Sequence, residues 1–151
     1  MSSAAHGFPS HVAAQLTGIT LRTLLNWSTR GFFLPSVKRG GRGLGNHSVY
    51  SFQDLVAIRV VDELRAQGID VRHLRDVVAH IRRREDVALD ADIPANRMLV
   101  SDGRTFMRID QDNVRTAEVR QPGQAPKVLL LVPLGAIVGQ LQLDARALLA
   151  A

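Results

Sequence analysis

Two short stretches near the start of the chain carry apolar residues at helical spacing. Residues 11–16 place apolar side chains on one face of a predicted helix, and residues 21–30 form a second segment of this kind. Gly18 separates the two, and glycine accepts the positive φ of a tight turn at little cost. The spacing therefore predicts a helix-turn-helix unit.

The second of these helices has recognisable ends and an inner side. Thr20 is its expected N-cap, as Ser10 is for the first helix, and Gly31 is expected to end it. Leu24 and Trp27 lie three positions apart, so they share one side of the helix. Both side chains are therefore predicted to pack in the core.

Two longer helices are predicted in the middle of the chain. Ser51 and Asp54 have the spacing of a capping box, which opens a helix that runs to about Ala66. Asp70 is the expected cap of the next helix, which runs to about Arg84. The positions predicted to face inward are Leu55, Ile58, Val61 and Leu64 in the first helix and Leu74, Val77, Val78 and Ile81 in the second.

The segment between these helical pairs has no helical periodicity. It reads "SVKRGGRGLGNHSVY" over residues 36–50 and follows an apolar group that ends at Pro35. A phosphate-binding loop would need a strand before its glycines and a helix directly after them, and the pattern predicts neither. The alternatives are a flexible loop and a wing on a nucleic-acid backbone, where glycine allows close approach and cations supply contacts.

The pattern changes again after residue 85. Residues 86–97, which include "DVALDADIPA", contain a proline and several acids and are interpreted as a linker. A small antiparallel sheet and a helix at 134–149 are predicted beyond it, with strands expected at 98–100, 105–109, 114–119 and 127–132. The chain is thus interpreted as an α+β protein with a domain at 1–85, the linker, and a small αβ unit at 98–151.

The positive charge of the chain is concentrated in its first third. Residues 1–50 contain five basic residues and no Asp or Glu, whereas the other 14 basic residues are matched by 14 acidic ones. Clustered cations gain free energy by releasing counterions from a phosphate backbone, so this distribution indicates a polyanionic partner. A membrane surface would attract the same charges, but it would call for an amphipathic helix with a basic face.

Other classes of function find little support in the sequence. The chain has no cysteine, which excludes disulfides and thiolate ligands and favours the cytoplasm. Its longest apolar run, residues 128–138, is shorter than the ~20 residues that span a bilayer. His73 and His80 offer only two potential metal ligands and are interpreted as surface residues. Since no nucleophile is paired with a base, we expect no enzymatic activity, metal or other cofactor.

Two stretches resemble the winged helix-turn-helix of MerR-type regulators. They read "AAQLTGITLRTLLNWSTRGFFLP" at 13–35 and "YSFQDLVAIRVVDELRAQGIDVRHLRDVV" at 50–78, with the basic segment between them. The likeness includes the Gly18 turn, the aromatic Trp27 and Pro35, and it covers about half of the chain. It implies an N-terminal domain of four helices plus a wing, followed by the small antiparallel β unit and its C-terminal helix.

The resemblance implies that residues 21–30 are a recognition helix in the major groove of double-stranded DNA and that the wing contacts the backbone. Arginine pairs with guanine and asparagine with adenine, so these residue types suit that role. The residues predicted to bind DNA are Thr20, Arg22, Thr23, Asn26, Arg30, Lys38, Arg39, Arg42, His47, Ser48 and Tyr50. Two departures remove expected cations, because Leu25 and the pair His47 and Ser48 stand where many family members have arginine.

The resemblance also implies a function. We expect a bacterial, cytoplasmic and nucleoid-associated transcriptional regulator, a homodimeric repressor or autoregulator whose C-terminal unit dimerises. One alternative is an antitoxin whose C-terminal part binds a toxin. Another is an excisionase-like factor that bends DNA. The break at 86–97 and the lack of cysteine disfavour an activator with a metal-sensing coiled coil.

Overall fold

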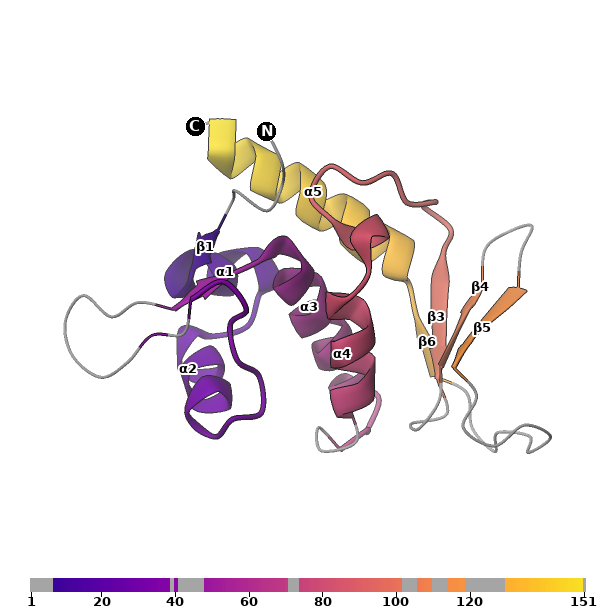
Figure 1. Ribbon diagram of the computed structural model, residues 1–151, viewed down its shortest axis with the longest axis horizontal. Coiled ribbons are helices and arrows are strands. Elements are labelled where there is room, and N and C mark those ends of the chain that lie inside the picture. Colours follow the sequence, from indigo (N-terminus) through magenta and orange to yellow (C-terminus); the bar gives the residue numbers. More distant parts are fainter. Residues whose placement is uncertain are drawn as a thin grey trace.

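The computed structural model of the protein describes residues 7–38, 40, 48–70, 74–101, 106–109, 114–118 and 130–150. These residues form an α+β fold, in which a helical N-terminal part is followed by a four-stranded antiparallel sheet and a C-terminal helix (Figure 1). The fold class predicted from the sequence is therefore confirmed.

The first two helices are short and joined by a tight turn. Helix α1 spans Ser10–Thr17 and helix α2 spans Leu21–Thr29. Gly18 ends α1 with a φ of 78°, as predicted. The prediction that Ser10 caps α1 is wrong, because Ser10 is the first helical residue and Pro9 precedes it without a side-chain cap.

Helix α2 begins and ends as its sequence indicates. The hydroxyl of Thr20 accepts a hydrogen bond from the N–H of Thr23 at 3.1 Å, which confirms the cap. Gly31 follows the helix with a φ of 72°. Leu24 and Trp27 are both buried, so the inner side of the helix is also confirmed.

The two ends of the glycine-rich segment 36–50 lie side by side. Strand β1 (Phe8–Pro9) pairs with strand β2 (Val49–Tyr50) in antiparallel fashion. Lys38 lies on the other side of β2, where its N–H donates to the carbonyl of Val49 at 3.0 Å and its carbonyl accepts from Val49 at 2.7 Å. This pairing is the base of a hairpin, as a wing requires.

Helix α3 (Phe52–Ala66) lies at the centre of the molecule. Ser51 and Asp54 form the predicted capping box. The predicted inward-facing side chains Leu55, Ile58, Val61 and Leu64 are all fully buried. Val56 and Val60, on another side of the helix, are fully buried as well. A helix with buried apolar residues on more than one side needs a partner on each of those sides.

Two helices cover α3 from different directions (Figure 1). Helix α4 (Arg75–Arg82) buries the predicted stripe, which comprises Leu74, Val77, Val78 and Ile81. The predicted start of α4 after Asp70 falls at residues 71–73, outside the described residues. Helix α5 (Leu134–Ala150) crosses α3 and α1 and so covers the second side of α3.

The C-terminal sheet has the strand order β5-β4-β3-β6, with all described pairs antiparallel. Its strands are β3 (Met98–Ser101), β4 (Phe106–Ile109), β5 (Val114–Glu118) and β6 (Leu130–Val132), close to the predicted bounds. Leu99 of β3 lies opposite Arg108 on one side and Val132 on the other. Within the described part of the chain, no helix is long and apolar enough to cross a membrane.

The segment interpreted as a linker, residues 86–97, packs against the rest of the chain. Val87, Leu89 and Ile93 are buried and belong to the same hydrophobic cluster as the helices of the N-terminal part. The side-chain amide of Gln142 in α5 donates to two carbonyls of this segment, at 3.0 and 2.7 Å. Within the described residues, the N-terminal part and the C-terminal unit therefore share one core.

We predict that Gly135→Ala destabilises the protein. The new methyl group would overlap the carbonyl oxygen of Pro94 and lie 2.7 Å from that of Ala95, and both are backbone atoms that cannot simply turn away. Overpacking of this kind costs about 1–3 kcal/mol. The quantity to measure is the free energy of unfolding in urea.

The matched control is Gly139→Ala, one turn further along α5, where nothing lies within 4 Å of the added methyl group. Alanine inside a helix is favoured over glycine by about 0.5–1 kcal/mol, so this variant should be stabilised. Equal effects of the two substitutions would contradict the close approach of residues 94–95 to α5.

Candidate nucleic-acid interface

Helix α2 presents a continuous face to solvent. Its exposed residues recur at helical spacing and, with the residue that follows the helix, are Leu21, Arg22, Leu25, Asn26, Thr29 and Arg30. Thr23 is half-buried beside its cap. The predicted recognition residues of α2 therefore lie on an accessible surface, while Leu24 and Trp27 anchor the opposite side.

Aromatic packing holds α2 in place from behind. The ring of Trp27 meets Phe32 edge to face at 5.3 Å between centroids and lies 6.5 Å from Phe33. The guanidinium group of Arg65, from the end of α3, lies 5.5 Å from the Trp27 ring centroid. The N–H groups of Phe32 and Phe33 both donate to the carbonyl of Trp27, so the chain turns sharply as it leaves the helix.

A buried carboxylate ties the chain beyond α2 to the start of α3. Asp54 is fully buried, and its Oδ2 accepts hydrogen bonds from the N–H of Ser36 at 2.8 Å, from the Ser36 hydroxyl at 2.8 Å and from the N–H of Ser51 at 3.0 Å. The Nε of Arg82 lies 3.0 Å from Oδ1 as an ion pair. Buried charge of this kind is tolerated when it is paired and hydrogen-bonded.

Arg82 extends this network to α4. Its guanidinium group stacks over the Phe33 ring at 4.0 Å and donates to the carbonyl of Leu34. Asp54 and Arg82 together thus connect three segments: the chain that leaves α2, the N-terminus of α3 and the C-terminus of α4. Because the segment predicted to form the wing begins at Ser36, this network fixes the start of that segment relative to α2.

Three basic residues of the predicted interface are exposed, namely Arg22, Arg30 and Lys38. No ion pair between them and another described residue is present, and residues 1–50 contain no carboxylate to form one. The predicted contacts Arg39, Arg42 and His47 lie outside the described residues. The cations of α2 and the wing base are therefore available to an anionic ligand.

Two predicted DNA contacts lie in the interior instead. Tyr50 is fully buried at 0% exposure, and Ser48 is buried with its hydroxyl accepting from the N–H of Gly40 at 3.0 Å. Both side chains are therefore largely inaccessible at the surface of this structure. His80, interpreted as a surface residue, is likewise buried on the inner side of α4.

Burial raises the pKa of the Tyr50 hydroxyl above its usual value, and the nearby charge of Asp54 acts in the same direction. The folded protein therefore favours the neutral phenol. Tyr50 is a structural residue whose ionisation is coupled to the network around Asp54.

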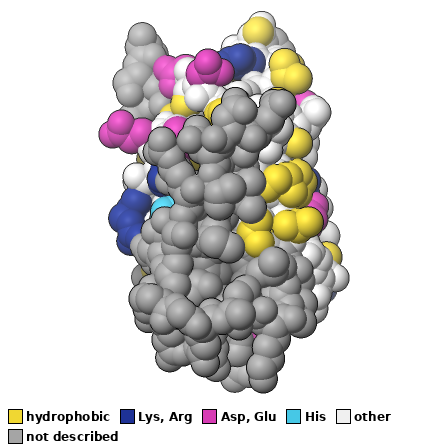
Figure 2. All heavy atoms as spheres, turned by 90° about the vertical axis from the view of Figure 1, so that its right-hand side faces the viewer, with side chains coloured by type: hydrophobic (Ala, Val, Ile, Leu, Met, Phe, Trp, Pro, Cys, Tyr) yellow, Lys and Arg dark blue, Asp and Glu magenta, His cyan; other side chains and the backbone are white. Residues whose placement is uncertain are grey.

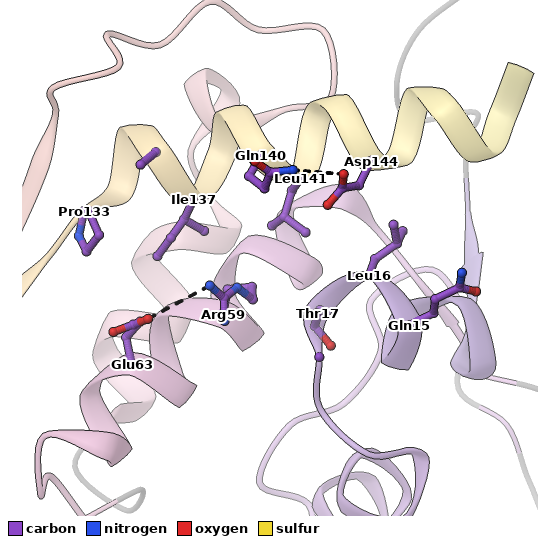
Figure 3. A pocket seen from close by; sticks show the side chains of 12 residues that line it. Gln15, Leu16, Thr17, Arg59, Glu63, Pro133, Ile137, Gln140, Leu141 and Asp144 are labelled. Carbon is purple, nitrogen blue, oxygen red and sulfur yellow. Dashed lines mark hydrogen bonds and ion pairs between the residues drawn. The ribbon is translucent and has the colours of Figure 1, made fainter.

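A depression of about 430 Å³ lies where α5 crosses α1 and α3 (Figure 3). Four of its polar side chains form pairs: Arg59 lies 4.0 Å from Glu63, and Gln140 donates to Asp144 at 3.0 Å. Among the described residues, no group of three potential metal ligands is present. The depression lies apart from the exposed face of α2, and none of the predicted DNA-binding residues lines it.

Comparison with known proteins gives matches to helix-turn-helix regulators. The family model for the MerR HTH family regulatory protein matches residues 8–81. Uncharacterized HTH-type transcriptional regulators from Mycobacterium bovis and from two strains of Mycobacterium tuberculosis are each 35% identical over 99 residues, which covers 66% of this chain. The chain spans 41% of the length of these relatives.

We predict that Asp54→Ala lowers the free energy of unfolding by about 3–5 kcal/mol, because it leaves the guanidinium group of Arg82 and the Ser36 and Ser51 donors without their partner. Asp62→Ala on the same helix is the matched control. Asp62 forms a partly exposed pair with Arg65 at 2.9 Å, and such pairs contribute less than about 1 kcal/mol. Similar losses in the two variants, measured by urea unfolding, would contradict the role given to Asp54.

The raised pKa of Tyr50 predicts a loss of stability in alkali. Above about pH 10 the phenol of the unfolded chain ionises while that of the folded chain stays neutral, so the free energy of unfolding falls as pH rises. Tyr50 is the only tyrosine in the chain, and tyrosinate absorbance therefore follows this group alone. We expect it to titrate at higher pH in the folded protein than in urea; coincident titrations would mean that the hydroxyl is solvated.

Proposed function

Residues 8–81 of this chain form a helix-turn-helix domain of the MerR family, and on this basis we propose that the protein is a transcriptional regulator that binds double-stranded DNA at specific sequences. The observation that carries the proposal is the exposed face of α2, which holds unpaired cations in a segment without carboxylates. An accessible helix with basic and amide side chains suits the major groove, which is wide enough to admit a helix.

The residues of α2 have distinct proposed roles. Arg22 at the start of the helix donates to the O6 and N7 of a guanine, and Asn26, one turn later, pairs with the N6 and N7 of an adenine. Arg30, exposed just after the helix, contacts a phosphate group. Thr23 is half-buried, so its proposed role is a contact between its hydroxyl and the DNA backbone.

The wing is proposed to contact the sugar-phosphate backbone beside the recognition helix. Lys38 is exposed at the base of the hairpin, and Arg39 and Arg42 follow it in the sequence. Backbone contacts of this type position a protein on DNA without reading sequence. The network of Asp54 and Arg82 supports such a role, because it holds the wing base at a constant distance from α2.

We propose that the protein acts as a homodimer joined through the C-terminal unit. The outer face of α5 carries Leu143 at 64% exposure, and β6 carries Leu131 at 55%. Figure 2 shows hydrophobic side chains gathered along one edge of the face that carries the C-terminal unit. Exposed apolar surface of this kind is typical of association sites.

A dimer would bind two half-sites at once. Once one helix-turn-helix domain is bound, the second binds its half-site at a high effective concentration, which raises the affinity of the dimer without new contacts. Half-site centres are expected about one helical turn, ~34 Å, or a multiple of it apart. The simplest action of such a dimer is repression or autoregulation, because occupying a site at a promoter requires only tight binding.

We predict that Arg22→Ala and Lys38→Ala weaken DNA binding in different ways. Loss of Arg22 should cost about 1–3 kcal/mol on the preferred duplex and relax the choice of base at one position of each half-site. Loss of Lys38 should weaken all duplexes alike and reduce the slope of log affinity against log salt by about one. Both can be measured by fluorescence anisotropy with a selected and a scrambled duplex.

Arg146→Ala is the control for the loss of one positive charge. Arg146 is exposed on α5 and donates to the carbonyl of Leu89, away from α2. Its replacement should leave base preference and salt dependence unchanged. The proposed function fails if wild-type protein binds no duplex at low salt, or if all three variants bind equally well.

A further inference from the structure

Two large apolar side chains lie on the solvent-exposed face of α2. Leu21 is 41% exposed and Leu25 is 46% exposed, one helical turn apart. A single exposed leucine needs no explanation, but these two lie together beside Arg22 and Asn26. Their positions place apolar surface in the middle of the face proposed to read DNA.

The fold itself does not need these side chains on the surface. Leu24 and Trp27 already supply the buried side of α2, and both are packed in the core. Neither Leu21 nor Leu25 belongs to that cluster of buried residues. A role for them therefore has to come from a partner that covers this face.

The charges around the leucines indicate which partner that is. Arg22 and Arg30 lie on the same exposed face, and no carboxylate occurs in residues 1–50. Such a face suits a polyanion better than the apolar surface of another protein. In the major groove, the one apolar group on the edge of an unmodified base pair is the C5-methyl group of thymine.

We propose that Leu21 and Leu25 read thymine methyl groups in the bound DNA. The inference rests on the proposed function and specifies it, because it assigns part of the base preference to apolar contact and not to hydrogen bonds. Arg22 and Asn26 select bases through donors and acceptors, while the two leucines select thymine over cytosine, which lacks the methyl group.

The test begins with selection of a preferred duplex from random sequences by the 151-residue chain. Each thymine of one half-site is then replaced singly by deoxyuridine, which removes only the methyl group. We expect the affinity to fall about fourfold at one or two positions, as for the loss of one buried methyl contact. Replacement of the other thymines should have no effect.

The same duplexes are then measured with Leu21→Ala, Leu25→Ala and a control, Leu149→Ala, at the end of α5. All three leucines are exposed, so their replacement leaves the core intact. Each α2 variant should lose the discrimination between thymine and deoxyuridine at one position, whereas Leu149→Ala should keep it at both positions.

The possible outcomes separate the inference from the proposed function. If the wild-type protein selects a duplex but every deoxyuridine substitution is neutral, the inference is overturned and the proposed function stands. The same holds if both α2 variants keep full discrimination. If the protein selects no duplex, the proposed function is overturned, and the inference with it.

Discussion

A carboxylate buried in an apolar interior is stable only when donors surround it, and Asp54 obtains its donors from separate parts of the chain. Ser36 comes from the segment after α2, Ser51 from the start of α3 and Arg82 from the end of α4. If one of these groups were removed, the groups that it contacts would stay buried without a hydrogen-bond or ion-pair partner. This one group therefore sets the positions of the chain beyond α2, the start of α3 and the end of α4 relative to one another.

Much of the fold could be predicted from local patterns. The capping box of Ser51 and Asp54, the Thr20 cap and the strands of the C-terminal sheet are encoded by neighbouring residues, and the structure agrees. The packing of α5 against α3 could not be predicted, because the apolar residues of a helix do not identify the element that covers them. For the same reason the packing of residues 86–97 against α5 could not be predicted, although the apolar residues Val87, Leu89 and Ile93 indicate that this segment is partly buried.

The candidate site was predicted in part. Helical spacing is sufficient to predict that Arg22 and Asn26 lie on the exposed face of α2 and that Trp27 lies on its buried side. It could not place Tyr50 and Ser48, because the side of a short strand that faces inward depends on what packs against it. The sequence around Asp54 predicts only its role as a cap, since its partners Ser36 and Arg82 are 18 and 28 positions away. The exposure of Leu21 and Leu25 could have been predicted, because helical spacing places them on the same face as Asn26.

The central claim is that the exposed face of α2 meets DNA while the aromatic side stays packed. The most direct measurement is the change in backbone amide NMR signals of the 151-residue chain when a selected duplex is added. The account predicts that the largest changes fall at Leu21, Arg22, Leu25 and Asn26 and at Lys38, with α5 little affected. Changes confined to residues 130–150, with α2 unaffected, would contradict it.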